Sequence, residues 1–324
     1  MDQQLVSEFV AAVPLETGRV RNPPPFILLC GARPGRDPTE PSSAREAFHG
    51  YLRQNRSNLA GQVILAEDVN DGSAQAGFRD LLEFQEYLAH LVALILVFVD
   101  SAGSIAELST FASLSLLSEK TLAVIEQSLA GPERSFIRDG PLARLSKETA
   151  GGVHCYDWLT TSGPQRIDPH RLLPACADLA SSVEAFCRQL NRSDALNGTK
   201  LAHKMLLVAD LANIFRILTF QEVREIFKQL SMELEAGELR KYLFVLEKLG
   251  LITRFSYSHQ QWYVCERSFI DYAYRPPARY TERLRWREKH RRSYAERGDD
   301  KRVNAYIAYT KAQGGLKRGD RNPA

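Results

Sequence analysis

Runs of consecutive apolar residues alternate with amphipathic segments along the chain as far as Leu190. The runs are rich in branched and aromatic side chains, which is typical of strands buried on both faces of a parallel sheet. The intervening segments carry apolar residues every three or four positions, as amphipathic helices do. This rhythm predicts βαβ units and an α/β fold whose strand-end loops share one edge. We expect strands at 26–32, 62–66, 94–99, 121–125 and 153–158, and helices at 44–58, 78–91 and 169–190.

From Thr199 the pattern becomes helical, with predicted helices at 200–218, 221–229 and 236–249. Two alternating segments follow, 251–256 and 261–266, with Ser258 and His259 at a predicted hairpin turn. Three helices and a hairpin are the element order of a winged helix-turn-helix. The third helix, the candidate recognition helix, carries Arg240 and Lys241 beside acidic residues, so it either reads DNA or has a packing or partner-docking role.

Positive charge is concentrated after residue 274. The net charge is +3, yet residues 275–324 hold 15 Lys and Arg against 6 Asp and Glu. We therefore expect three parts, 1–195, 196–274 and a basic tail over 275–324. Arginines alternate there with aromatic residues, a composition that suits a phosphate-bearing partner. The alternative is a solvated helix with pairs such as Glu288 and Arg292. The candidate partner-binding residues of the tail are Arg283, Arg285, Arg287, Lys289, Arg291 and Arg292.

The composition is that of an ordinary globular protein, with 44% hydrophobic and 25% charged residues. No apolar run is long enough for a membrane span, and the first residues lack the basic leader of a signal peptide. We therefore expect a cytoplasmic protein. The five cysteines are scattered without a CxxC pair, so neither a disulfide framework nor a metal site is expected.

Residues 94–112 hold the candidate chemistry. A buried strand is predicted to end at Asp100, small residues follow, and a helix is predicted over 105–113 with Glu107 near its start. The carboxyl end of a strand in an open α/β sheet is where ligands bind, and a helix N-terminus favours anions. The alternative is that Glu107 only interacts with the helix dipole.

A carboxylate without a neighbouring His, Cys or metal-ligand cluster suits attack on, or stabilisation of, the anomeric carbon of a ribosyl group, because N-glycosidic cleavage passes through an oxocarbenium-like state. Neither GxxxxGK[ST] nor GxGxxG occurs, which disfavours ATP hydrolysis and a classical dinucleotide-binding loop. Glu107 is the predicted catalytic residue, and the predicted substrate-binding residues are Gly31, Arg33, Asp68, Asp100, Ser101, Gly103 and Ser104.

The segment SAGSIAEL, residues 101–108, resembles the D-x-G-x-x-x-E-L nucleophile motif of nucleoside deoxyribosyltransferases. It is also similar to the glycine-rich turn and glutamate of phosphoribohydrolases related to lysine decarboxylase-like proteins. Together with FILLCGAR at 26–33 and the winged-helix pattern, the whole chain resembles the effector proteins of retrons, which are bacterial anti-phage systems.

This resemblance implies a nucleoside deoxyribosyltransferase-like, Rossmann-like domain followed by a mainly helical winged helix-turn-helix domain. It implies that Glu107 is the catalytic carboxylate of a toxin that cleaves an N-glycosidic bond without a cofactor. NAD is the favoured substrate, and a nucleoside or nucleotide is the alternative. It also implies a reverse transcriptase and its branched RNA–DNA hybrid, the msDNA, as inhibitory partners, and a homo-oligomer. Ser101 stands where the transferases have Asp, and a shift of one residue turns Asp100 to the opposite face, so hydrolysis is favoured over base exchange.

Two other functions fit the sequence. The chain could be a transcriptional regulator whose α/β domain senses a nucleotide without cleaving it and whose winged helix binds DNA. It could also be an assembly subunit without activity, in which Glu107 tolerates substitution.

Overall fold

The computed structural model describes residues 3–21, 23, 25–33, 35, 41–131, 134–149, 151–160, 167–190, 193–274 and 282–319. The chain forms two compact units. The sheet unit comprises Pro23–Gly72 and Asp80–Asn191, and the helical unit comprises Met1–Asn22, Ser73–Arg79 and Arg192–Ala324.

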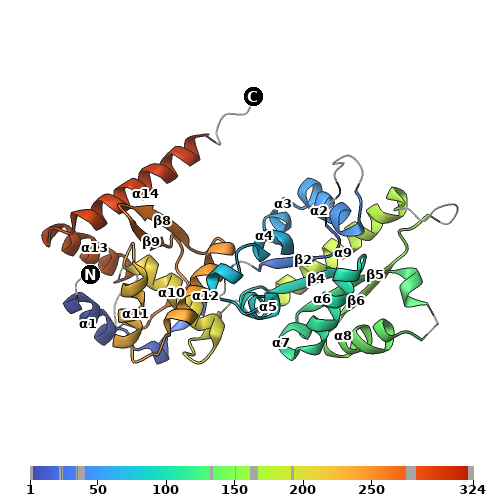
Figure 1. Ribbon diagram of the computed structural model, residues 1–324, viewed down its shortest axis with the longest axis horizontal. Helices are drawn as coiled ribbons and strands as arrows, with labels where there is room; N and C mark the ends of the chain where they lie inside the picture. Colours follow the sequence, from blue (N-terminus) through green and yellow to red (C-terminus); the bar gives the residue numbers. More distant parts are fainter. Residues whose placement is uncertain are drawn as a thin grey trace. The chain divides into compact units, whose positions relative to one another are not determined.

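The sheet unit contains a five-stranded parallel sheet (Figure 1). From edge to edge, its strands are β3 (Val63–Leu65), β2 (Ile27–Cys30), β4 (Leu94–Phe98), β5 (Thr121–Glu126) and β6 (Val153–Tyr156). The predicted α/β fold is thus confirmed, with every predicted strand in the sheet. The chain runs outward from β2 to β3, then returns to the other side of β2 at β4, so the topological switch point lies between β2 and β4.

Helices pack on the sheet because successive strand residues point to opposite faces. On one face α2 (Ala44–Asn55) and α9 (Pro169–Gln189) bury an apolar core with β2, β4 and β5. The helix that follows β4, α6 (Ala102–Ser113), packs against β4 and β5. The shorter helices of this unit are α3 (Ser57–Ala60), α4 (Ala66–Asn70), α5 (Leu81–Ala89), α7 (Ser115–Ser118) and α8 (Ala143–Glu148).

The helical unit contains the predicted three helices and hairpin. The helices are α10 (Leu201–Ile214), α11 (Phe220–Gln229) and α12 (Ala236–Lys248), and the hairpin strands are β8 (Thr253–Tyr257) and β9 (Gln260–Val264). The hairpin turns at Ser258 and His259, whose φ angles are 49° and 59°, as a tight two-residue turn requires. These elements follow the order expected for a winged helix-turn-helix.

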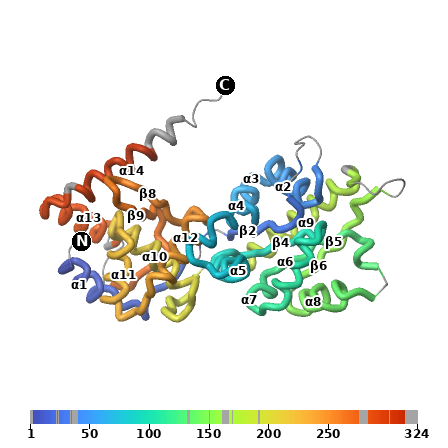
Figure 2. Tube along the Cα trace, in the orientation of Figure 1, coloured from blue at the N-terminus to red at the C-terminus, as the bar shows by residue number. Residues whose placement is uncertain are grey.

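The N-terminal segment belongs to the helical unit, although we expected it in the first domain. The strand β1 (Arg19–Arg21) pairs antiparallel with β7 (Ser193–Ala195) and β10 (Ile270–Asp271). Preceding it, α1 (Gln3–Ala12) contacts α11, and the two are neighbours in Figure 2. Phe9 of α1 is fully buried against aromatic rings of this unit. These pairings join distant parts of the chain, which local periodicity does not reveal.

The basic segment also differs from the expected tail, because its helices pack into the helical unit. The helices are α13 (Glu282–Glu296) and α14 (Asp300–Gly319). Trp286, Tyr294 and Tyr309 are buried there. None of the helices in the described ranges is long and apolar enough to cross a membrane.

Candidate functional site

The loops after β2 and β4 meet at the switch point. The backbone amide of Ala32 donates a 2.7 Å hydrogen bond to Oδ1 of Asp100, which joins the two strand ends. Gly31 allows this approach: a Cβ atom there would lie 2.9 Å from Cδ of Arg45 and 3.1 Å from Cβ of Phe98. The strand end therefore needs glycine at this position.

A serine capping box starts α6 beside this point. Ser101 Oγ accepts a 3.1 Å hydrogen bond from the Ser104 amide, and Ser104 Oγ accepts from the amides of Asp100 and Ser101. The helix consequently begins at Ala102, earlier than predicted. Ser104 is 1% exposed, so its hydroxyl holds the helix start rather than facing a ligand as we expected. Gly103 is exposed in the first turn.

Glu107 lies in the second turn of α6 and is partly buried. No described residue donates a hydrogen bond to its carboxylate or pairs with it. Burial raises the pKa of Glu107, the charge of Arg45 opposes this change, and the charge of Glu67 adds to it. The dipole interpretation weakens, because a helix dipole acts mainly within the first turn. Glu107 is therefore a partly desolvated carboxylate with no partner among the residues that the structure describes.

An arginine that the sequence analysis missed stands among the acidic residues. Arg45 of α2 is 2% exposed and donates to both carboxylate oxygens of Glu67, at 2.7 and 2.6 Å. Such a two-pronged pair is strong and directional. One signal was available: Arg45 is the second residue of its helix, where a cation opposes the helix dipole. Asp68, which follows β3, was the predicted substrate-binding residue here, yet it is the neighbouring Glu67 that pairs with Arg45.

The cluster around Arg45 carries more negative than positive charge. Asp100 has one buried oxygen, Oδ2, without a hydrogen-bond partner in the described part of the chain. Burial raises the pKa of Asp100, and the Ala32 amide and Arg45 oppose that shift. Burial, and then the charge of Glu107, also raises the pKa of the fully buried Cys30, which keeps its thiol neutral. Glu67, Asp100 and Glu107 thus share the electrostatic influence of one arginine.

Two predicted residues lie at the margin of the cluster. Arg33 is exposed, and its charge helps to lower the pKa of Glu67 after hydrogen bonding by Arg45. Asp68 is exposed on α4 and acts electrostatically on His49. The structure therefore brings together Gly31, Asp100, Ser101 and Glu107. Among the described residues, no group of three His, Cys, Asp or Glu side chains could hold a metal ion.

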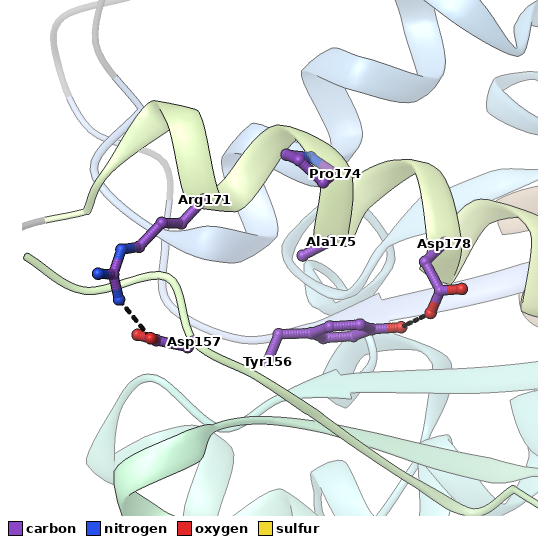
Figure 3. A pocket seen from close by; sticks show the side chains of 6 residues that line it. All are labelled: Tyr156, Asp157, Arg171, Pro174, Ala175 and Asp178. Atoms are coloured by element: carbon purple, nitrogen blue, oxygen red, sulfur yellow. Dashed lines mark hydrogen bonds and ion pairs between the residues drawn. The ribbon is translucent and has the colours of Figure 1, made fainter.

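A separate open hollow of about 310 Å³ lies at the end of β6 (Figure 3). Its carboxylates are both engaged: Asp178 accepts a 2.7 Å hydrogen bond from the Tyr156 hydroxyl, and Asp157 pairs with Arg171. Burial and the neighbouring Asp178 raise the pKa of Tyr156, which stays protonated. The acidic groups of this hollow thus make internal contacts, whereas Glu107 has no hydrogen bond or ion pair with a described residue.

The sequence of the chain matches a known protein family. The family model described as STM3845 retron effector protein matches residues 41–254 of the chain. The chain belongs to this family of retron effectors. The resemblance seen in the sequence is thus confirmed at the level of the family.

One curated relative from Escherichia coli carries the name "Retron Ec73 putative ribosyltransferase/DNA-binding protein". It is 25% identical to the effector over 146 residues, which are 44% of this chain and 45% of the relative. The match thus spans less than half of either protein.

The predicted basic residues of the effector fall into different environments. Arg283 is an internal residue rather than a ligand-facing one: it donates to both oxygens of the fully buried Asp210, each at 3.0 Å, and to Asn213. A second buried arginine, Arg302, pairs with Glu222 and Asp299. Neither guanidinium is available to a partner molecule.

Other predicted residues of α13 are compensated at the surface. Arg291 and Arg292 both pair with Glu288, and their hydrogen bonds lower the pKa of that carboxyl to about 2. Lys289 pairs with Glu8 at 3.0 Å. Arg285 is exposed and also interacts with another group of the protein. Arg287 is the exception, because it lies partly buried without a carboxylate partner among the described residues.

The proposed recognition helix α12 is partly covered within its own unit. Phe78 is 5% exposed and lies against the Phe244 ring, with 6.0 Å between ring centroids. The Lys241 ammonium lies 5.5 Å from the Phe78 centroid, so this residue is engaged in packing. Arg240 is exposed, with its guanidinium 5.9 Å from the Phe220 ring. These contacts favour the packing interpretation of α12.

Proposed function

We propose that this effector cleaves the N-glycosidic bond of NAD and that Glu107 is the carboxylate that acts at the anomeric carbon. The observation that carries the proposal is the state of that carboxylate. It is partly buried beside the switch point and has no internal partner in the described residues, while Glu67 is held by Arg45. A buried charge without a structural partner is a candidate reactive group.

The excess negative charge suits the transition state of this reaction. As the bond between the ribosyl carbon and the base nitrogen breaks, its electron pair leaves with the base and positive charge develops on the sugar. Glu107 stabilises or traps that carbon, and a water molecule then adds and releases a proton. Because the nicotinamide of NAD is already cationic, it leaves as a neutral molecule without protonation by an acid. NAD therefore fits a site in which carboxylates surround Arg45, because the departing base needs no proton from an acid.

We infer that Asp100 orients the sugar. Its Oδ1 accepts a hydrogen bond from the Ala32 amide, and its Oδ2 is buried without a partner among the described residues, so Oδ2 can accept a hydrogen bond from a ribose hydroxyl. On this proposal the Asp100 carboxylate contacts the sugar, although it is displaced by one residue from the Asp of the transferase motif. The relative named as a ribosyltransferase supports chemistry at a ribosyl group.

The partners follow from the retron family. We propose that a reverse transcriptase and its branched RNA–DNA hybrid hold the effector inactive until infection, and that the helical unit contacts them. The engaged face of α12 argues against the alternative in which this helix alone reads operator DNA.

The test is release of nicotinamide from NAD by the purified protein. Glu107→Gln is expected to lower the rate by at least about 10²-fold while the protein remains folded, because it removes the charge that the transition state needs. Glu86→Gln is the matched control, since Glu86 is an exposed carboxylate of the same unit, and it should leave the rate unchanged.

Undiminished nicotinamide release by the Glu107→Gln protein would overturn the role of Glu107. Release of a base from nucleosides but not from NAD would replace the substrate. If neither NAD nor nucleosides are cleaved and the protein binds duplex DNA in a salt-sensitive way, the alternative function of a transcriptional regulator is favoured.

A further inference from the structure

Arg216 and Arg287 of the helical unit have no carboxylate partner among the described residues, in contrast to two of its buried arginines. Arg283 is paired with Asp210, and Arg302 with Glu222. Arg216 and Arg287 make no ion pair among the described residues. In both, the Nε atom is buried and has no hydrogen-bond acceptor. Arg224 on α11 also has a buried Nε atom without an acceptor in the described residues, but its Nη1 atom donates a hydrogen bond to Gln221 of the same helix.

Arg216 is held in a fixed position at the end of α10. Its Nη1 donates a 2.9 Å hydrogen bond to the Tyr306 hydroxyl, and its guanidinium carbon lies 5.5 Å from the centroid of that ring. Its φ angle is 70°, a left-handed conformation that glycine usually occupies after a helix. An arginine at this position is conformationally unfavourable, yet it directs a cation toward Tyr306.

Arg287 approaches the same place from α13. The two elements are in contact close to both arginines: the ring centroid of Phe215, which precedes Arg216, lies 4.0 Å from the ring centroid of His290, one helical turn after Arg287. Burial, followed by the charge of Arg216, lowers the pKa of Arg287, and the charge of Glu266 acts in the opposite direction. Glu266 is exposed and interacts with Tyr309. Two positive charges therefore repel each other where solvent is partly excluded.

We propose that Arg216 and Arg287 together bind a phosphate group. A phosphate offers acceptor oxygens to both unused Nε donors and neutralises the repulsion between the two guanidinium groups. The planar fork of arginine matches the spacing of phosphate oxygens, which makes this pair a better phosphate site than a surface lysine. The site is independent of the sheet unit and of the proposed activity of Glu107.

The source of the phosphate is either a nucleic-acid backbone or a free phosphate. Fluorescence anisotropy with a short labelled single-stranded oligonucleotide tests the first source. Arg216→Gln and Arg287→Gln are each expected to weaken binding by about tenfold, because each removes a charge-assisted hydrogen bond. Arg292→Gln is the matched control on α13: it removes the same charge from a 69% exposed side chain and should weaken binding by less than about twofold.

Thermal unfolding in inorganic phosphate, compared with chloride at equal ionic strength, tests the second source. The wild-type protein and Arg292→Gln should gain stability in phosphate, whereas the two test variants should not. Arg287→Lys keeps the charge but lacks the planar fork, so it should retain part of the effect and remain informative if Arg287→Gln fails to fold.

Dependence of oligonucleotide binding on both arginines supports a backbone phosphate. If the two substitutions remove only the stabilisation by inorganic phosphate and leave oligonucleotide binding unchanged, the ligand is a free phosphate. If neither effect changes in Arg216→Gln and Arg287→Gln, the proposal is wrong.

Discussion

The end of the parallel sheet and the helix α13 hold unpaired charges of opposite sign. In the sheet unit, Glu107 and one oxygen of Asp100 have no partner among the described residues, although Arg45 and Glu67 beside them form a close pair. In the helical unit, Arg287 has no carboxylate partner in the described part of the chain, although Arg283 on the same helix is paired with Asp210. Each region thus contains a paired and an unpaired charge side by side.

This contrast separates structural from functional charges. A buried ion pair satisfies its own members, and its loss exposes an uncompensated charge to a poor solvent. An unpaired buried charge lowers stability in the free protein and is compensated when a ligand or a transition state supplies the opposite charge. On this basis Arg45 and Arg283 stabilise the fold, whereas Glu107, Arg216 and Arg287 are the residues that we propose for ligand binding.

The largest effect is expected from Arg283→Met. This change leaves Asp210, whose side chain is 0% exposed, without its cation, and should lower the free energy of unfolding by about 3–5 kcal/mol. Denaturant titration measures the change. The control is Arg292→Met on the same helix, which breaks only an exposed pair and should change stability by less than about 0.5 kcal/mol. Equal effects of the two variants would remove the distinction between buried and surface pairs.

An intermediate effect is expected from Gly31→Ala. The new methyl group would lie 2.9 Å from Arg45 Cδ, so the paired arginine or the strand end must move, at a cost of about 1–3 kcal/mol. Gly50→Ala is the control, because a Cβ there meets no atom within 4 Å and alanine favours the helix by about 0.5–1 kcal/mol. The two alanine variants should therefore shift the unfolding midpoint in opposite directions. A Gly31→Ala protein as stable as the wild type would show that the loop is not tightly placed.

The sequence predicted the sheet and its ligand-binding edge because both depend on local pattern. Apolar runs mark buried strands, and polar residues that directly follow them, such as Asp100, must lie at the carboxyl edge. Gly31 was found in the same way.

The remaining features depend on contacts between distant segments. Arg45 and Glu67 meet only when α2 packs over the sheet, and Asp210 lies 73 residues before Arg283. The basic segment therefore looked like a tail, because its compensating carboxylates and aromatic contacts come from elsewhere in the chain. Ser104 was misinterpreted because a helix cap and a phosphate-binding turn use the same residue types.

The unfolding free energy of wild-type and Glu107→Gln protein, measured across pH, tests whether Glu107 is held unpaired at a cost in stability. Because burial raises the pKa of Glu107 above 4.5, the folded state binds its proton more tightly than the unfolded state does. As the pH rises from 4.5 through the pKa that Glu107 has in the folded protein, the wild type should therefore lose stability relative to Glu107→Gln. At neutral pH the wild type should be the less stable of the two proteins. The difference should be smaller than for the two substitutions above and should shrink as the pH falls below 4.5. If Glu107→Gln is instead less stable than the wild type at neutral pH, the Glu107 carboxylate has a structural partner. That result would contradict the claim that Glu107 is left unpaired to act on a ligand.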